Sequence, residues 1–448
     1  MSVSSKAASY LVVLRLPLAR RTFVAALVGR LSYGIVFLAL LLTITRATSS
    51  YTVAGSVLAL FGLGSFALAP YRARLIDRYG PRRALPPMAA VYAALLVAIA
   101  AAAWQPGTSR PILWLLGAGC GACAPPLGPF MRTLWAVIVP PEGELLQRAY
   151  ALDTVAEDLL YVIGPLLAGL FTAYANPAVG VAVSAAMVLI GSVAVVTSPV
   201  VSRLDHQQTP DEASPGAKAS KRASKLRQSL WGGTGLFDPV IISGGLGICL
   251  GALNLLAVSF AGSHGGTALV AWVDATMAAG SALGGLIYGA ISWQIAIRLR
   301  LPLLAAFFGL LVAVAGQSGS MPVLVVVAGG AGLFVSPILV TAYLIANEAS
   351  SPGSRTEAGT WVNTAFNAGN SAGTAGIGLF FGLVSLPLCF TIAAAAIVLP
   401  AAEVATHFCW SGIQRMLRLG RKPVGQDRTR AIWNDVDEQP TMPVDDPE

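Results

Sequence analysis

Three charged side chains lie inside long apolar stretches of this sequence. Arg30 falls within the apolar run 22–45, and Asp153 and Glu157 fall within the run 149–173. If these runs cross a bilayer, each charge costs roughly 2.5–3.5 kcal/mol on insertion. Charges in such places line a substrate or ion pathway, or they pair with one another. These three residues are therefore the first candidates for chemistry.

The depth of the charges in their runs predicts how they pair. Arg30 lies eight residues after Thr22, and Glu157 lies eight residues after Ala149. At about 1.5 Å per residue, both lie about 12 Å deep from the same side if the runs are helices. We expect Arg30 to pair with Glu157 or Asp153 where the helices touch. The pair is a substrate or proton site, at which a proton or a cationic substrate competes with Arg30, or a structural ion pair. A third possibility is that the acids lie close enough to the cytoplasm to be hydrated.

Helical periodicity sorts the acidic residues of the run 149–173 onto two faces. Asp153 and Glu157 share one face through their i, i+4 spacing, and Tyr161 continues that face as a further pathway residue. Asp158 points about 100° away from Glu157. We interpret Asp158 as an anchor near the cytoplasmic side.

Other polar side chains in apolar runs are candidates for the walls of a cavity. Asn363, Asn367 and Asn370 follow i, i+4, i+7 spacing and form one polar stripe. Such a stripe either faces water in a central cavity or makes hydrogen bonds between helices. Asn254 and Asp274 are single polar positions; for Asp274 an outer vestibule and a hydrated interface are both open.

The composition identifies the elements that must position these residues. Of the 448 residues, 55% are hydrophobic and 11% are charged, with mean hydropathy +0.70, whereas soluble domains carry roughly 25% charged residues. A bilayer core of about 30 Å needs about 20 apolar residues per helix. Twelve runs fit this length or come close: 22–45, 50–71, 84–104, 111–131, 149–173, 177–199, 236–260, 267–291, 301–318, 321–346, 357–384 and 386–409. The predicted fold class is an all-α integral membrane protein with twelve transmembrane helices.

The distribution of basic residues predicts the orientation. With both termini in the cytoplasm, all 29 Lys and Arg except Arg30, Arg46 and Arg110 fall in cytoplasmic segments. The predicted location is therefore the cell membrane. The domains follow as an N-terminal segment (1–21), six spans (22–199), a basic polar linker (200–235), six further spans (236–409) and a cytoplasmic tail expected to be disordered (410–448).

The most basic connection between two apolar runs is the stretch 72–83. It holds five arginines and Asp77, and Gly80 with Pro81 predicts a tight turn. Its first role is to fix which side is cytoplasmic. It also resembles the loop between the second and third helices of the major facilitator superfamily, with Ala73 where that pattern has glycine. The matching residues are Leu75, Asp77, Arg78, Gly80, Arg82 and Arg83.

The two halves of the chain echo each other, as the same family resemblance implies. Gly164 follows Arg148 at the same offset as Ser371 follows Arg355. The resemblance implies two pseudo-symmetric bundles of six helices that work by alternating access. It further implies that Asp77 pairs with a neighbouring helix end or with arginines and, with Arg78, Gly80, Arg82 and Arg83, forms a gating loop.

Short strings refine the resemblance. The stretches 355–364 and 284–289 resemble an actinobacterial branch of the family. Gly164, Pro165 and Gly169 form a helix-packing motif that partly matches the fifth span of its drug-efflux antiporters, which favours export. The run 111–131 has no arginine in its middle, where proton antiporters of the family carry one, so Arg30 would have to take that place.

The predicted function is a secondary active transporter that moves a small molecule by proton-coupled efflux. Alternatives are an uptake permease or facilitator of the same fold, or a non-transporting sensor or partner subunit. Cys120 and Cys123 lack a second ligand pair, and no nucleotide motif is present, so we expect no enzyme activity, no metal and no cofactor. The net charge of +8 lies between apolar runs, where it meets membrane lipid rather than nucleic acid. We expect a monomer.

Overall fold

A computed structural model describes residues 10–105, 107–140, 144–208, 234–264, 270–380 and 383–419. These residues are helical apart from short connections. The chain divides into a compact unit, residues 1–402, and a second unit, residues 403–448. The spanning helices lie in the first unit, except that the last of them continues into the second.

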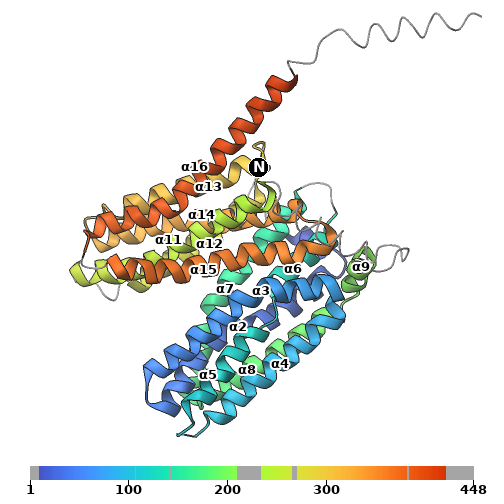
Figure 1. The fold of residues 1–448 in the computed structure, drawn as a ribbon, viewed down its shortest axis with the longest axis vertical. Helices are drawn as coiled ribbons and strands as arrows, with labels where there is room; N and C mark the ends of the chain where they lie inside the picture. Colours follow the sequence, from blue (N-terminus) through green and yellow to red (C-terminus); the bar gives the residue numbers. More distant parts are fainter. Residues whose placement is uncertain are drawn as a thin grey trace, which may run out of the picture. The chain divides into compact units, whose positions relative to one another are not determined.

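The first half of the chain forms one helical bundle (Figure 1). Its fourth span is broken, because Pro125 and Pro126 lack the backbone N–H groups that would continue the helix. Two shorter helices, α5 and α6, therefore share this span. The elements are α2 (Ala19–Thr48), α3 (Tyr51–Tyr79), α4 (Pro81–Ala102), α5 (Arg110–Cys123), α6 (Leu127–Ile138), α7 (Leu145–Tyr174) and α8 (Pro177–Val196), followed by α9 (Pro199–Gln208).

The second half supplies α11 (Thr234–His264), α12 (Val270–Ala290), α13 (Ile297–Ala315), α14 (Met321–Ala349), the 3₁₀ turn η2 (Pro352–Ser354), α15 (Arg355–Phe380) and α16 (Leu386–Leu419). Within the described residues, eleven spans are long and apolar enough to cross a membrane. Helix α15, with 26 residues, is similar in length to these eleven spans, but its asparagines make it more polar than they are. With α15 as the twelfth, the predicted all-α membrane fold is confirmed.

Glycines let several helix pairs approach closely. A Cβ atom built on Gly164 of α7 would lie 2.3 Å from the carbonyl carbon of Gly34 on α2, and one on Gly191 of α8 would lie 2.3 Å from the Gly29 nitrogen. In the second half, a Cβ on Gly284 of α12 would overlap the backbone of α14. Without a hydrophobic force between helices in lipid, such close contacts supply much of the packing energy.

The sequence predicts a loop over the stretch 72–83, but the structure has helix there. Helix α3 continues to Tyr79 and α4 begins at Pro81, so only Gly80, at φ 80°, separates them. Arg72 is buried and its guanidinium donates to four backbone carbonyls, at Gly64, Ser65, Gly121 and Ala122. Arg72 thus ties α3 to the broken end of α5 rather than marking the membrane surface.

The predicted linker and tail lie largely outside the described residues. Helix α9 covers the first part of the stretch 200–235, and the residues from 209 to 233 are not described. Helix α16 continues through Leu419, past the expected end of the last span at 409.

Of the two glycines in the predicted packing motif of α7, only one is crowded. We expect Gly164→Ala to lower the free energy of unfolding by about 1–3 kcal/mol, because its Cβ would overlap α2. Gly169→Ala is the matched control, since nothing lies within 4 Å of its Cβ position. Thermal unfolding of both variants in detergent measures the difference, and equal melting temperatures would contradict this packing.

Candidate functional site

A cavity of about 660 Å³ lies between the two halves of the first unit. One wall is formed by α2, α6 and α7, a second by α3, and the third by α15. The wall on α3 is largely apolar, whereas the wall on α15 is polar. The polar and charged lining residues are Arg30, Tyr33, Ser65, Arg72, Glu157, Tyr161, Thr360, Asn363, Thr364, Asn367, Asn370 and Ser371.

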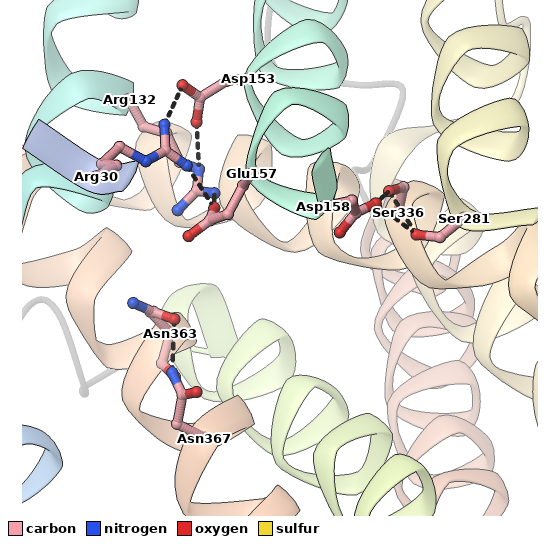
Figure 2. A network of polar contacts seen from close by, with 9 residues as sticks. All are labelled: Arg30, Arg132, Asp153, Glu157, Asp158, Ser281, Ser336, Asn363 and Asn367. Atoms are coloured by element: carbon pink, nitrogen blue, oxygen red, sulfur yellow. Dashed lines mark hydrogen bonds and ion pairs between the residues drawn. The ribbon is translucent and has the colours of Figure 1, made fainter. Parts of the chain in front are cut away.

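Arg30 contacts both of the acidic residues that the sequence pairs with it. Its Nη1 atom lies 2.8 Å from Asp153 Oδ1, and its Nη2 atom lies 2.7 Å from Glu157 Oε2. Helix α2 packs along α7, and Arg30 and Glu157 lie at similar depths in these two helices. Their side chains are therefore in direct contact (Figure 2). The sequence predicts that Arg30 pairs with Asp153 or Glu157, and in the structure it pairs with both.

A second arginine, Arg132, completes this network, and the sequence reasoning missed it. Its Nε atom lies 3.2 Å from Asp153 Oδ2, and its Nη2 atom donates to Glu157 (Figure 2). The Tyr343 ring of α14 stacks against this guanidinium, at 3.7 Å from ring centre to Cζ. The middle of the fourth span has no arginine, as expected, but Arg132 lies within α6 near the end of that span, so its assignment to a cytoplasmic segment is wrong.

The reason for this error is the proline break in the fourth span. Arg132 follows the apolar run 111–131, so the sequence pattern assigns it to a cytoplasmic segment. Beyond Pro126, however, α6 continues to Ile138, and Arg132 lies on a turn of α6 whose residues are all buried. The proline pair was the available signal, since it allows the span to extend beyond its apolar core.

The members of the network differ in their access to the cavity. Asp153 is fully buried, Arg30 is 3% exposed, and the Glu157 side chain is 22% exposed. The network is formally neutral, with two guanidinium groups and two carboxylates. Glu157 is therefore the acidic group that a molecule in the cavity meets first.

The asparagine stripe of α15 faces the cavity (Figure 2). Asn367 donates from Nδ2 to Asn363 Oδ1 at 2.8 Å, and Asn370 and Tyr161 also line the cavity. Asn254 on α11 and Asp274 on α12 are exposed and are not among the lining residues. The structure thus brings the stripe to the ion-pair network and leaves these two residues apart.

Asp77 contacts the second half of the chain at the end where α3 meets α4 (the α3–α4 end). Its Oδ2 atom accepts a hydrogen bond of 2.9 Å from the backbone N–H of Glu357, in the first turn of α15. Arg74 pairs with the Glu357 side chain at 2.5 Å. The carboxylate of Asp77 therefore caps a helix of the opposite half, where unpaired N–H groups attract negative charge.

Of the other residues of the predicted gating loop, Arg78 and Arg82 make contacts within the first half. Arg78 stacks over the Tyr79 ring at 5.3 Å, and Arg82 donates to Ser202 of α9 at 2.7 Å. Arg83 is exposed, and Gly80 is the turn between the helices.

Two further contacts from α7 reach the second half, one at the α3–α4 end and one near the middle of the helix. Gln147 donates to the Tyr288 carbonyl of α12 at 2.8 Å. Asp158, expected to be an anchor, accepts from Ser281 at 2.8 Å and from Ser336 at 3.0 Å (Figure 2). It therefore bridges the halves.

Arg132 should be required for stability. Arg132→Gln leaves Asp153 and Glu157 with one guanidinium between them, and breaking such a buried pair costs about 3–5 kcal/mol. Arg110→Gln is the control, because Arg110 is exposed at the start of the same span. We expect a lower melting temperature in detergent for Arg132→Gln alone; if both variants melt together, the network is not a stabilising one.

Comparisons with known sequences agree along most of the chain. The sequence model of the Major Facilitator Superfamily matches residues 22–372. A protein of Sinorhizobium fredii described as an uncharacterized MFS-type transporter, y4rN, is 30% identical over 225 residues, which are 50% of this chain and 51% of that protein. The chain thus matches about half the length of this curated relative.

Solved structures share the fold at low sequence identity. A bacterial homologue of the iron transporter ferroportin, in its outward-facing state, has a TM-score of 0.65 and 14% identity, over 88% of this chain and 99% of that one. The Escherichia coli fucose:proton symporter FucP has a TM-score of 0.62 and 15% identity, with the same coverage. The human organic anion transporter MFSD10 (TETRAN) has a TM-score of 0.61 and 14% identity, over 86% and 99%. By its sequence and by this fold, the chain belongs to the Major Facilitator Superfamily of membrane transporters.

Proposed function

We propose that this protein is a secondary active transporter that exports a small molecule in exchange for protons, with Glu157 as the coupling residue. The observation that carries the proposal is the position of Glu157. Its carboxylate belongs to a neutral network of four charges, of which the other three are buried, and it is also the acid that borders the cavity. A change of charge at Glu157 therefore alters the electrostatic energy of both Arg30 and Arg132.

The proposed exchange follows from this charge balance. When a proton binds Glu157, the carboxylate becomes neutral and Arg30 loses one of its two partners. The network then carries one excess positive charge, which is costly in a medium of low polarity. An anionic substrate group that contacts Arg30, or a movement of the halves that lets Glu157 release its proton, restores the balance.

The contacts between the halves favour one orientation of the cavity. Asp77, Arg74 and Gln147 hold the halves together at the α3–α4 end, which the charge pattern of the sequence assigns to the cytoplasm. In this assignment both termini are cytoplasmic and the cavity is reached from outside the cell membrane. This is the state in which an exporter has released its substrate and takes up protons.

Export rather than uptake is supported by the α7 packing motif, in which Gly164 meets α2 directly. The cavity combines an apolar wall on α3 with amides and hydroxyls on α15, which suits a small amphipathic substrate. We expect the protein to act as a monomer in membrane lipid, since the cavity is built within one chain.

An uncoupled facilitator or uptake permease is the second candidate. The observation that favours it is the ion pairing of Glu157 with both Arg30 and Arg132. Two cations beside one carboxylate oppose the binding of a proton. In this alternative the network is structural, and transport does not depend on a pH gradient.

The test begins with a ligand. A melting screen of the purified protein against small organic compounds identifies molecules that bind the folded state, since such ligands raise the melting temperature. The strongest hit is then loaded into proteoliposomes, and its movement is followed with and without a pH gradient.

Glu157→Gln separates the two candidates. For a proton-coupled exporter, we expect this variant to lose the transport driven by the pH gradient while it still inserts and binds the hit. Glu348→Gln is the control, because Glu348 is exposed on α14 and does not line the cavity. Unchanged gradient-driven transport in Glu157→Gln would refute coupling at this residue, and wild-type transport that ignores the gradient would favour the facilitator.

Asp77 should control the rate of cycling. Asp77→Ala removes the cap on α15, which is worth about 0.5–2 kcal/mol, and so weakens the closed α3–α4 end. We expect slower transport with ligand binding retained. Asp77→Asn keeps an acceptor oxygen but loses the charge, so it should impair transport less. Normal turnover in both variants would show that Asp77 has no gating role.

A further inference from the structure

Three oxygen atoms from three helices meet near the middle of these helices, at almost the same height as Glu157. Asp158 Oδ2 of α7 lies 2.8 Å from Ser281 Oγ of α12 and 3.0 Å from Ser336 Oγ of α14. The two serine oxygens are themselves 2.9 Å apart. Both serines are buried. The three atoms therefore form a closed triangle in which every contact has the length of a hydrogen bond.

The number of protons in this triangle depends on the charge of Asp158. Each serine hydroxyl has one proton and donates one hydrogen bond. With an ionised carboxylate, two protons serve three contacts, so one contact joins two oxygens with no proton between them. With a protonated Asp158, three protons serve three contacts, and each oxygen donates once and accepts once.

We propose that Asp158, Ser281 and Ser336 form a proton-binding site that is occupied while the α3–α4 end is closed. The proton comes from water and bonds to the Asp158 carboxylate. It returns to water when α7 separates from α12 and α14 and the triangle opens. This site is distinct from Glu157, whose carboxylate is paired with two guanidinium groups.

The charged groups around Asp158 are engaged elsewhere. Glu157 precedes it on α7 and Arg132 lies on α6, and both belong to the ion-pair network. On α14, Tyr343 stacks against Arg132. On α12, Asp274 is exposed and about two turns from the serine of the triangle. Within the part of the chain that the structure describes, the side chain of Asp158 accepts hydrogen bonds from hydroxyl groups and forms no ion pair.

The surrounding packing links this site to the movement of the halves. On α7, Ala151 and Val155 lie on the same side as Asp158, and each faces a glycine of α12. A Cβ on Gly285 would lie 2.9 Å from Val155 Cγ2, and one on Gly289 would lie 2.6 Å from Ala151 Cβ. A movement that separates α7 from α12 and α14 at this face would take Asp158 away from both serine partners.

Infrared difference spectroscopy tests the protonation directly and needs no substrate. We expect the purified protein, titrated with acid and base, to show a C=O stretching band of a protonated carboxyl group that Asp158→Asn lacks. The double variant Ser281→Ala, Ser336→Ala should shift this band, while Asp274→Asn should leave it in place. A band that persists in Asp158→Asn, or no titrating band in the wild type, would overturn the proposal.

The same titration in Glu157→Gln keeps the two proposals apart. The Asp158 band should persist in Glu157→Gln. The infrared titration therefore still tests protonation of Asp158 even if Glu157 has no role in proton coupling. If Glu157→Gln abolishes the band and Asp158→Asn does not, the proton belongs to the network instead.

Spin labels test the link to closure. Tyr79 and Gln294 are exposed at the α3–α4 end, one in each half, and their separation is measured in a background without native cysteines. Loss of the proton removes about one hydrogen bond, so the ratio of open to closed molecules should rise about two- to tenfold at high pH. In Asp158→Asn, whose amide is always neutral, this ratio should not change with pH. An unaltered pH response in this variant would contradict the link.

Discussion

The structure depends on the pairing of two guanidinium groups with two carboxylates at a place where three of the four groups are buried and Glu157 is partly exposed. A lone charge there would carry a desolvation cost of several kcal/mol. Arg30 and Arg132 each contact both Asp153 and Glu157, so no member is left with a single partner. Because the four residues come from α2, α6 and α7, this requirement also fixes how these three helices meet.

The cavity follows from that arrangement. The network is covered on most sides, and Glu157 is its partly exposed member. Across the cavity, α15 presents amides and hydroxyls instead of charges. This explains why α15 falls below the apolarity of the other spans: its polar face borders the cavity rather than lipid. The first turn of the same helix is capped by Asp77, so α15 contributes both to the cavity wall and to the closed α3–α4 end.

Much of this could be predicted from the sequence, and the failures have two physical causes. The spans, the pairing of Arg30 and the asparagine stripe depend on apolar length and helical periodicity, which are local. Arg132 and Arg72 were misplaced because helices do not end where apolar residues end. Each of these arginines continues a helix beyond its apolar run and finds partners on another helix. The partners of Asp158 depend on how the two halves pack, which no local pattern records.

The three acidic residues of α7 show how one helix gives similar groups different environments. Asp153 and Glu157 are one turn apart, so both face the arginines, but only Glu157 is level with the cavity. Asp158 is rotated by about 100° and therefore points to the other half, where it meets hydroxyl groups. A rocking motion that leaves the first bundle intact would keep the ion-pair contacts of Asp153 and Glu157 and would break those of Asp158. Of these three acids, Asp158 is thus the one whose surroundings must change as the halves move.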